Sequence, residues 1–196
     1  MIHTDCVTTS HNYVKMTETI LANGTINPER LFDDEGIDTA ERTYTHGNEE
    51  HYRNRHGAGT VGRVIVGITD AGGRLLLLTD PEEGHALLPN DTVGSGEHWT
   101  TVARKWVEGQ AGIDVTIDGI ERLRRVEHAI EGEETPRSHV YHVVLSGSAV
   151  STEPGEVPLD ELGTDNPWEL GWYDQLPYEV EDPESDPIDD IRLFLD

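Results

Sequence analysis

Residues 88–115, LPNDTVGSGEHWTTVARKWVEGQAGIDV, decide the fold of this chain. The first ten positions are rich in glycine and polar residues and predict a loop. After them, apolar side chains recur at intervals of three and four residues, which is the spacing of one face of a helix. This spacing predicts a helix from about His98 to Ala111, with Gly112 as its C-terminal stop. The stripe on that helix comprises Trp99, Val102, Ala103, Trp106, Val107 and Gln110.

The sequence on both sides of this helix predicts strands. Before it, residues 61–68 are rich in β-branched side chains, residues 70–73 read DAGG, and residues 74–79 read RLLLLT, which together predict a hairpin. After it, residues 115–130 and 138–148 predict two more strands, joined by a loop that contains EGEETPR. Within the second of these, the alternation at residues 139–144 predicts one face that is buried more deeply than the other. Residues 168–177, WELGWYDQLP, predict a late strand that turns into a Leu-Pro segment.

Residues 88–113 resemble the Nudix box, G-x5-E-x7-R-E-U-x-E-E-x-G-U with U aliphatic, which a Leu-Pro pair commonly precedes. The positions that match without a gap are Leu88, Pro89, Glu97, Val107, Gly112 and Ile113, with Lys105 in place of the arginine. The chain departs from the motif at Asp91, which replaces the opening glycine. It departs again at Trp106, Gly109 and Gln110, which occupy the positions of the three helix glutamates.

The resemblance to the Nudix (MutT-like) hydrolase superfamily implies an α/β (α+β) fold, an α/β/α sandwich around a mixed β-sheet. We expect a polar N-terminal extension over residues 1–57 and a Nudix-like domain over residues 58–180. Residues 181–196 are expected to form an acidic linker and a short amphipathic helix, with Ile188, Ile191 and Leu195 on the side that docks on the domain.

In the family, the helix glutamates hold Mg²⁺ or Mn²⁺ against a diphosphate. An indole or a glycine hydrogen cannot replace a carboxylate oxygen around such an ion. We therefore expect a nucleoside-diphosphate-X hydrolase lineage that is weak or inactive in hydrolysis and acts as a ligand-binding or regulatory module, with no cofactor. The alternative is an active Mg²⁺- or Mn²⁺-dependent pyrophosphohydrolase that uses Glu97 and acids from outside the box.

The resemblance and the acidic loop at residues 131–134 supply the candidate site residues. Glu97 and Glu134 are the catalytic candidates, and Glu97 and Glu133 are the metal candidates. Lys105, Trp106 and Gln110 are the candidates for binding a nucleotide-like small molecule, with an indole ring available for stacking. Glu131 belongs to the same loop, but in so acidic a chain loop glutamates are common without a role.

The 196 residues include 39 acidic and 14 basic side chains, giving a formal net charge of -25. Such an excess with little lysine is typical of proteins that work in molar salt, where the Debye length falls to about 3 Å. It argues against a nucleic-acid partner and against an anionic membrane surface. The only cluster of basic residues, Arg122, Arg124 and Arg125, falls on a predicted strand, and we expect it at an edge or in solvent.

The cysteine content and the remaining segments give expectations about disulfides, localisation and the N-terminal part of the chain. The single cysteine, Cys6, excludes an intramolecular disulfide, and the absence of a signal-like or membrane-length apolar run indicates a cytoplasmic protein. Residues 13–21 predict a helix. His46, His51 and His56 recur every fifth residue, which favours a solvated loop, with a bound metal as the alternative. The sequence leaves the oligomeric state and the role of residues 1–57 open.

Overall fold

A mixed eight-stranded sheet in the order β1-β6-β7-β2-β3-β4, with β5 beside β2 and β8 beside β3, organises the part of the chain that the structure describes. The structure is a computed structural model that describes residues 26–34, 36–50, 52, 59–150, 168–177, 182 and 184–195. The strands are β1 (Asp38–His46), β2 (Thr60–Thr69), β3 (Leu75–Asp80), β4 (His85–Leu87), β5 (Asn90–Gly94), β6 (Val115–Ile130), β7 (Ser138–Ala149) and β8 (Glu169–Tyr173). The helices are α2 (Pro28–Leu31), α4 (Trp99–Ala111) and α5 (Asp186–Ile191).

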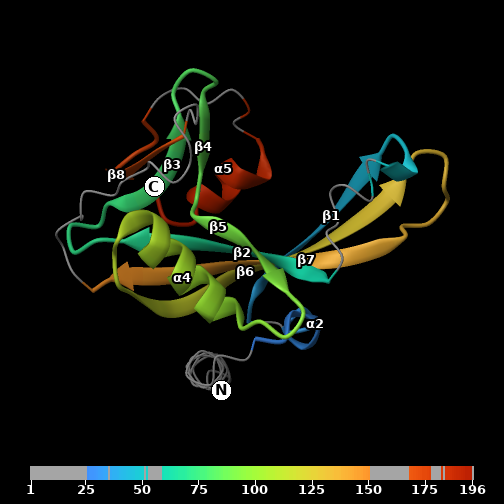
Figure 1. Ribbon diagram of the computed structural model, residues 1–196, viewed down its shortest axis with the longest axis horizontal. Helices are drawn as coiled ribbons and strands as arrows, with labels where there is room; N and C mark the ends of the chain where they lie inside the picture. The colour runs from blue at the N-terminus through green and yellow to red at the C-terminus, as the bar shows by residue number, and fades with distance from the viewer. Residues whose placement is uncertain are drawn as a thin grey trace, which may run out of the picture.

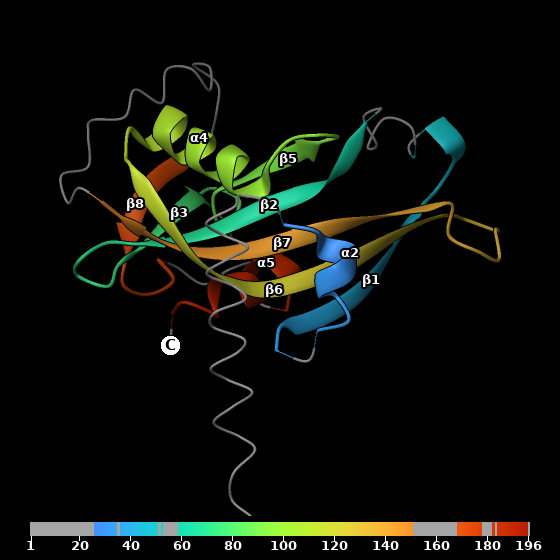
Figure 2. The same ribbon diagram turned by 90° about the horizontal axis from the view of Figure 1, so that it is seen from below.

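Helices cover both faces of this sheet, which is the α/β/α layering expected from the sequence. Figure 2 shows α4 on one side of the long strands and α5 on the other. Parallel pairs, β1 with β6 and β2 with β7, alternate with antiparallel pairs such as β6 with β7. The α+β fold class with a mixed sheet is therefore confirmed.

Helix α4 ends where the sequence predicts. Its C-cap Gly112 has φ of 61°, and the Gly112 amide donates to the Glu108 carbonyl oxygen at 3.0 Å. A left-handed conformation of this kind favours glycine because it has no Cβ. The buried side of the helix packs on β2, β6 and β7 through a core cluster that includes Val102, Val107 and Val64.

The predicted strands are confirmed with small changes at their ends, but the loop predicted for the first ten positions of residues 88–115 is wrong in part, because residues 90–94 form β5 beside β2. The turn at residues 70–74 joins β2 to β3, whose closing pair is Thr69 with Leu75. Strand β6 covers residues 115–130 as predicted, and β8 forms within the aromatic segment at residues 168–177. Figure 1 shows β2, β6 and β7 running side by side through the middle of the molecule.

The predicted burial alternation in β7 is wrong for its second half. Val143, Val144 and Leu145 are all fully buried, although successive side chains of a strand point to opposite faces. Val143 and Leu145 belong to the cluster under α4, whereas Val144 belongs to a second cluster under α5. Both faces are covered at this point, so no residue there needs to be polar.

The segment before residue 58 contributes directly to the sheet. Strand β1 pairs in parallel with β6 over its whole length, from Asp38 beside Arg122 to His46 beside Ile130. A boundary at residue 57 therefore separates two segments of one sheet. The helix predicted at residues 13–21 lies outside the described residues.

The expected docking of the C-terminal helix on its own domain is confirmed. Ile188 and Ile191 of α5 are 3% and 0% exposed, and Leu195 just beyond it is 9% exposed. These side chains pack with Leu75, Leu77 and other residues of the second cluster. Within the described residues, no helix combines the length and the apolar character that a membrane span requires.

Candidate functional site

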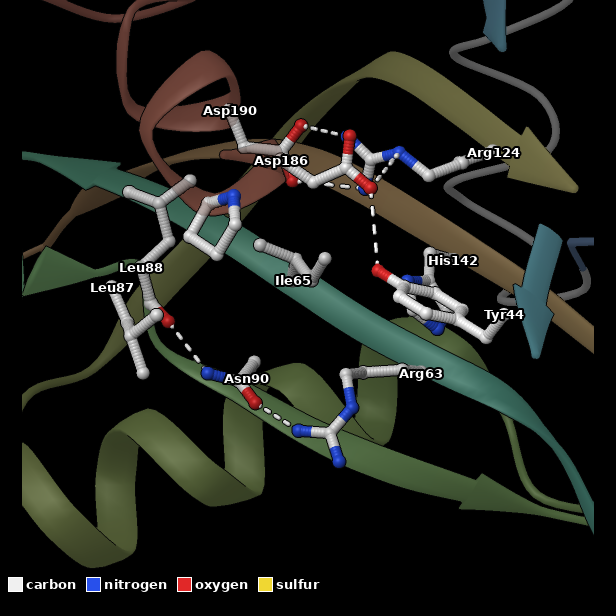
Figure 3. A pocket seen from close by; sticks show the side chains of 11 residues that line it. Tyr44, Arg63, Ile65, Leu87, Leu88, Asn90, Arg124, His142, Asp186 and Asp190 are labelled. Atoms are coloured by element: carbon white, nitrogen blue, oxygen red, sulfur yellow. Dashed lines mark hydrogen bonds and ion pairs between the residues drawn. The ribbon is translucent and has the colours of Figure 1, made fainter. Parts of the chain in front are cut away.

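A cavity of about 180 Å³ opens on the α5 face of the sheet (Figure 3). Its floor comes from β2, β6 and β7, one wall from β1, and the opposite walls from α5 and the segment that links β4 to β5. The lining residues are Tyr44, Arg63, Ile65, Leu87, Leu88, Asn90, Arg124, His142, Asp186, Pro187 and Asp190. The cavity therefore combines an aliphatic patch with a small number of charged and hydrogen-bonding groups, as ligand pockets commonly do.

A row of three basic side chains crosses the cavity floor. Arg63 of β2 pairs in register with His142 of β7, and His142 pairs in register with Arg124 of β6. Residues in direct register project to the same face of a sheet. Three neighbouring strands thus place the imidazole between two guanidinium groups, one on each side.

Arg63 stands at the open end of this row and has no carboxylate within 4.0 Å among the described residues. Its side chain donates a hydrogen bond to the Asn90 amide oxygen, and the Asn90 nitrogen donates to the Leu88 carbonyl oxygen at 2.8 Å. These bonds orient the guanidinium on the cavity wall without neutralising its charge. An arginine with no acidic partner, in a chain with 39 acidic residues, is a candidate for binding an anion.

Arg124 closes the other end of the row and is fully buried. Its guanidinium makes a two-bond contact with Asp190 of α5, with Nη2 to Oδ1 at 2.7 Å and Nη1 to Oδ2 at 3.2 Å. Arg122 reaches the same carboxylate at 3.1 Å and also Asp38 of β1 at 2.6 Å. The expectation that these arginines lie at an edge or in solvent is therefore wrong for Arg124, because α5 brings two aspartates over this face.

Burial and charge set the protonation of the groups beside the row. Desolvation, reinforced by Arg124 and Arg63, lowers the pKa of His142 to about 4, against a smaller opposing effect of Asp186 and with a further lowering by His128. Burial, with the negative charge of Asp186, raises the pKa of Tyr44. At neutral pH the imidazole is uncharged and the phenol protonated, so the cavity offers neutral hydrogen-bonding groups between two cations.

The candidate residues predicted on and before α4 lie outside this cavity. Arg63 and Ile65 of β2 line it, whereas Val64 and Val66, which point to the other face, pack in the cluster under α4. Lys105 is exposed, and Gln110 is partly buried. Trp106 is partly buried and packs against the cluster under α4, so its ring contributes to the core contact of the helix.

Two of the acidic candidates, Glu97 and Glu133, are held by local contacts. Glu97 is exposed, and its carboxylate accepts a hydrogen bond from the Gly94 amide at 2.8 Å. Glu133 pairs with Arg137, with Nε to Oε2 at 2.8 Å, and this hydrogen bond lowers the pKa of Glu133. Glu131 and Glu134 are exposed in the same loop.

The donor groups of the described residues are not clustered as a divalent metal ion requires. Across the described ranges, no three side chains of the His, Cys, Asp and Glu types are grouped as metal ligands. Mg²⁺ requires charged oxygens near octahedral geometry. Glu97 and Glu133 are each engaged with another partner, and the helix positions at 106, 109 and 110 offer one neutral oxygen, that of Gln110.

His46 is not in a solvated loop. It is 8% exposed at the end of β1, and its Nε2 lies 3.0 Å from Nδ1 of His128. The parallel pairing of β1 with β6 places the two histidines together, which their separation of 82 positions in the sequence concealed. His51 and His56 lie outside the described residues.

No family model matches the chain, and no curated protein matches it. Among solved structures, the chain is similar to a UDP-X diphosphatase, with 16% identity, coverage of 95% of this chain and 93% of that chain, and a TM-score of 0.45. An ADP-ribose pyrophosphatase from Streptococcus suis matches with 11% identity, 67% and 86% coverage, and a TM-score of 0.42. A Nudix hydrolase from Nitrosomonas europaea matches with 15% identity, 69% and 88% coverage, and a TM-score of 0.41.

Sequence reasoning missed the cavity because its residues come from six separate segments. One signal was present: Leu88, Pro89 and Asn90, the first residues of the box-like segment, lead directly to the cavity, and the first and last of them line it. A second signal was the even spacing of Arg122 and Arg124, which puts both side chains on one face of β6.

Proposed function

We propose that this chain is a Nudix-like ligand-binding or regulatory protein with weak or no hydrolytic activity, and that its ligand is a nucleotide-like anion. The observation that carries the proposal is the cavity in which Arg63, with no acidic partner among the described residues, lies beside an aliphatic surface formed by Ile65, Leu87 and Leu88. Such a site suits a molecule with one flat or apolar end and one anionic end.

The charges support an anionic ligand. Arg63 is held by Asn90, so little side-chain freedom would be lost when it binds a phosphoryl oxygen. His142 is neutral and donates or accepts a hydrogen bond without adding charge. Arg63 is exposed, and the aliphatic side chains beside it would shield its contact with a bound anion from water, which strengthens such a contact.

The departures from the motif support weak hydrolysis. Trp106 is engaged in the helix-to-sheet contact, and Gly109 and Gln110 offer no carboxylate. Loss of one group that stabilises the transition state commonly costs about 3 kcal/mol in activation free energy, so the loss of three leaves little rate.

Binding is tested by thermal unfolding of the full chain in molar KCl with nucleoside diphosphate sugars, ADP-ribose, dinucleoside polyphosphates and nucleoside triphosphates. A ligand present at 100 times its Kd adds about 2.7 kcal/mol to the free energy of unfolding. We expect Arg63→Gln to weaken binding by about tenfold or more, as expected for a lost charge-assisted hydrogen bond. Arg104→Gln is the matched control, because Arg104 is an exposed arginine on α4, across the sheet from the cavity.

The second candidate function is metal-dependent hydrolysis that uses Glu97, which lies at the start of α4 with an exposed carboxylate. Phosphate release from the same compounds with Mg²⁺ or Mn²⁺ tests it. Release that disappears in Glu97→Gln would replace the binding proposal with this one. If no compound binds to or is cleaved by the wild-type protein, neither function holds.

A further inference from the structure

One carboxylate on the cavity wall lies where three donors converge. Asp186, the first residue of α5, accepts from Arg42 Nε at 2.8 Å and from the Tyr44 hydroxyl at 3.4 Å, and it lies 3.5 Å from Arg124 Nε. Its side chain is 14% exposed. Figure 3 shows Asp186 between the guanidinium of Arg124 and the hydroxyl of Tyr44, with Arg63 on the far side of the cavity.

The donors around Asp186 are not fully satisfied by it. The Nε of Arg124 is buried and makes no hydrogen bond within the described part of the chain. Leaving a buried donor without an acceptor costs about 1–3 kcal/mol. A carboxylate has two oxygens in one plane, and here both are already directed at Arg42 and Tyr44. A tetrahedral phosphoryl group has a third oxygen, which could accept from the remaining donor.

The excess of positive charge on this face also favours the binding of an anion in addition to Asp186. Among the described residues, four arginines and three aspartates lie on this face, so the arginines are in excess even with Asp186 present, and without Asp186 the excess of positive charge would be larger. The arginines are Arg42, Arg63, Arg122 and Arg124, and the aspartates are Asp38, Asp186 and Asp190.

We propose that the contacts of Asp186 mark an anion-binding subsite formed by Arg42, Tyr44 and Arg124, and that Asp186 is an internal competitor for a phosphoryl group. This inference rests on the proposed function and extends it, because the competition sets the affinity of the cavity for its ligand. The ligand would displace the Asp186 carboxylate and take over its donors, while Asp190 keeps its two bonds to Arg124.

The position of Asp186 allows this exchange without unfolding α5. The apolar anchors of the helix, Ile188 and Ile191, lie further along the chain and are almost fully buried. The first residue of a helix has no hydrogen-bonding role inside the helix through its amide. Rotation of the Asp186 side chain therefore breaks its contacts to Arg42, Tyr44 and Arg124 Nε but leaves the backbone and the packing of the helix in place.

The test compares Asp186→Ala with Asp189→Ala in binding of inorganic pyrophosphate, measured by calorimetry in one fixed salt. Both variants remove one negative charge from α5, but Asp189 pairs with Arg192, outside the cavity lining. We expect Asp186→Ala to bind pyrophosphate about tenfold more tightly than the wild type, since it removes a competing charge-assisted contact. Asp189→Ala should leave the affinity within about twofold of the wild type, because long-range charge effects are screened.

A second variant and a second readout separate competition from simple damage to the fold. Asp186→Asn keeps the shape of the side chain without its charge, and we expect its affinity to lie between those of the wild type and Asp186→Ala. Pyrophosphate should also raise the melting temperature of Asp186→Ala more than that of the wild type, because it refills the vacated subsite.

The outcomes distinguish the two proposals. If nucleotide compounds bind the wild type but pyrophosphate affinity is unchanged or weaker in both Asp186 variants, the competition is refuted and the proposed function stands. If pyrophosphate binds Asp186→Ala tightly while no nucleotide compound binds the wild type, the subsite is real and the proposed function is wrong. If neither pyrophosphate nor any nucleotide compound binds to the wild type or to any variant, both proposals fail.

Discussion

Arg124 of β6 and Asp190 of α5 form a two-bond ion pair in which each side chain is 2% exposed. This pair fastens the last helix to the sheet and forms the closed end of the cavity. The pair is one part of a network, because Asp190 also accepts from Arg122 at 3.1 Å. The orientation of α5, and with it the position of Asp186, therefore depends on these ion pairs as well as on apolar packing.

Breaking this pair from one side should destabilise the protein strongly. We expect Asp190→Ala to lower the free energy of unfolding by about 3–5 kcal/mol, because it leaves a buried guanidinium without its main partner. The double variant Arg124→Met with Asp190→Leu should be more stable than Asp190→Ala, since no buried charge remains uncompensated. Urea unfolding measures both, and a double variant no more stable than the single one would contradict this account.

Two glycines near the end of α4 should respond in opposite directions to alanine. At Gly109 a Cβ meets nothing within 4 Å, and alanine should add about 1 kcal/mol through its higher helix propensity. At Gly112 the backbone has φ of 61°, where an L side chain is strained, and alanine should cost about 1 kcal/mol. Thermal unfolding of the two variants checks the pair; equal effects would mean that the helix does not end at Ala111.

His142 should make stability depend on pH in the mildly acidic range. Its pKa is about 4 in the folded protein against 6.5 for the unperturbed side chain, so the unfolded chain binds a proton first as the pH falls. Stability is therefore lost between about pH 6.5 and pH 4, with a slope of at most about 1.4 kcal/mol per pH unit from this group. Carboxylates also titrate near the lower end of this pH range. The quantity to measure is therefore the difference in free energy of unfolding between the wild type and His142→Gln at each pH. A difference that does not change with pH would show that His142 is not buried as described.

The net charge of -25 should make the fold dependent on salt. Repulsion among carboxylates is screened as the Debye length falls from about 10 Å at 0.1 M to about 3 Å at 1 M. We expect the melting temperature to rise with KCl over this range. Sucrose at matched osmolality is the control, and an equal rise in sucrose would attribute the effect to preferential exclusion instead of charge screening.

The sequence predicted α4 and the strands β2, β3, β6, β7 and β8, but it predicted no strand at β1, β4 or β5, and it predicted the tertiary relationships poorly. Helix α4, its stop at Gly112, the hairpin of β2 and β3, and the docked side of α5 all follow from periodicity and turn residues that lie close together in the chain. The burial of Arg124 could not be predicted in this way, because its partner Asp190 is 66 positions away. The same holds for the cavity, whose character depends on which face of β2 each residue occupies and on which helix covers that face.

The ion pair between Arg42 and Asp186 joins positions that are 144 residues apart. Contacts over such a separation require the closure of a very long loop and are expected to form late in folding. We expect a refolding chain to form the core beneath α4 before α5 completes the wall of the cavity on the opposite face. Recovery of ligand binding after dilution from denaturant should therefore lag behind recovery of helix and sheet structure, and the kinetics of the two signals would report on separate halves of the molecule.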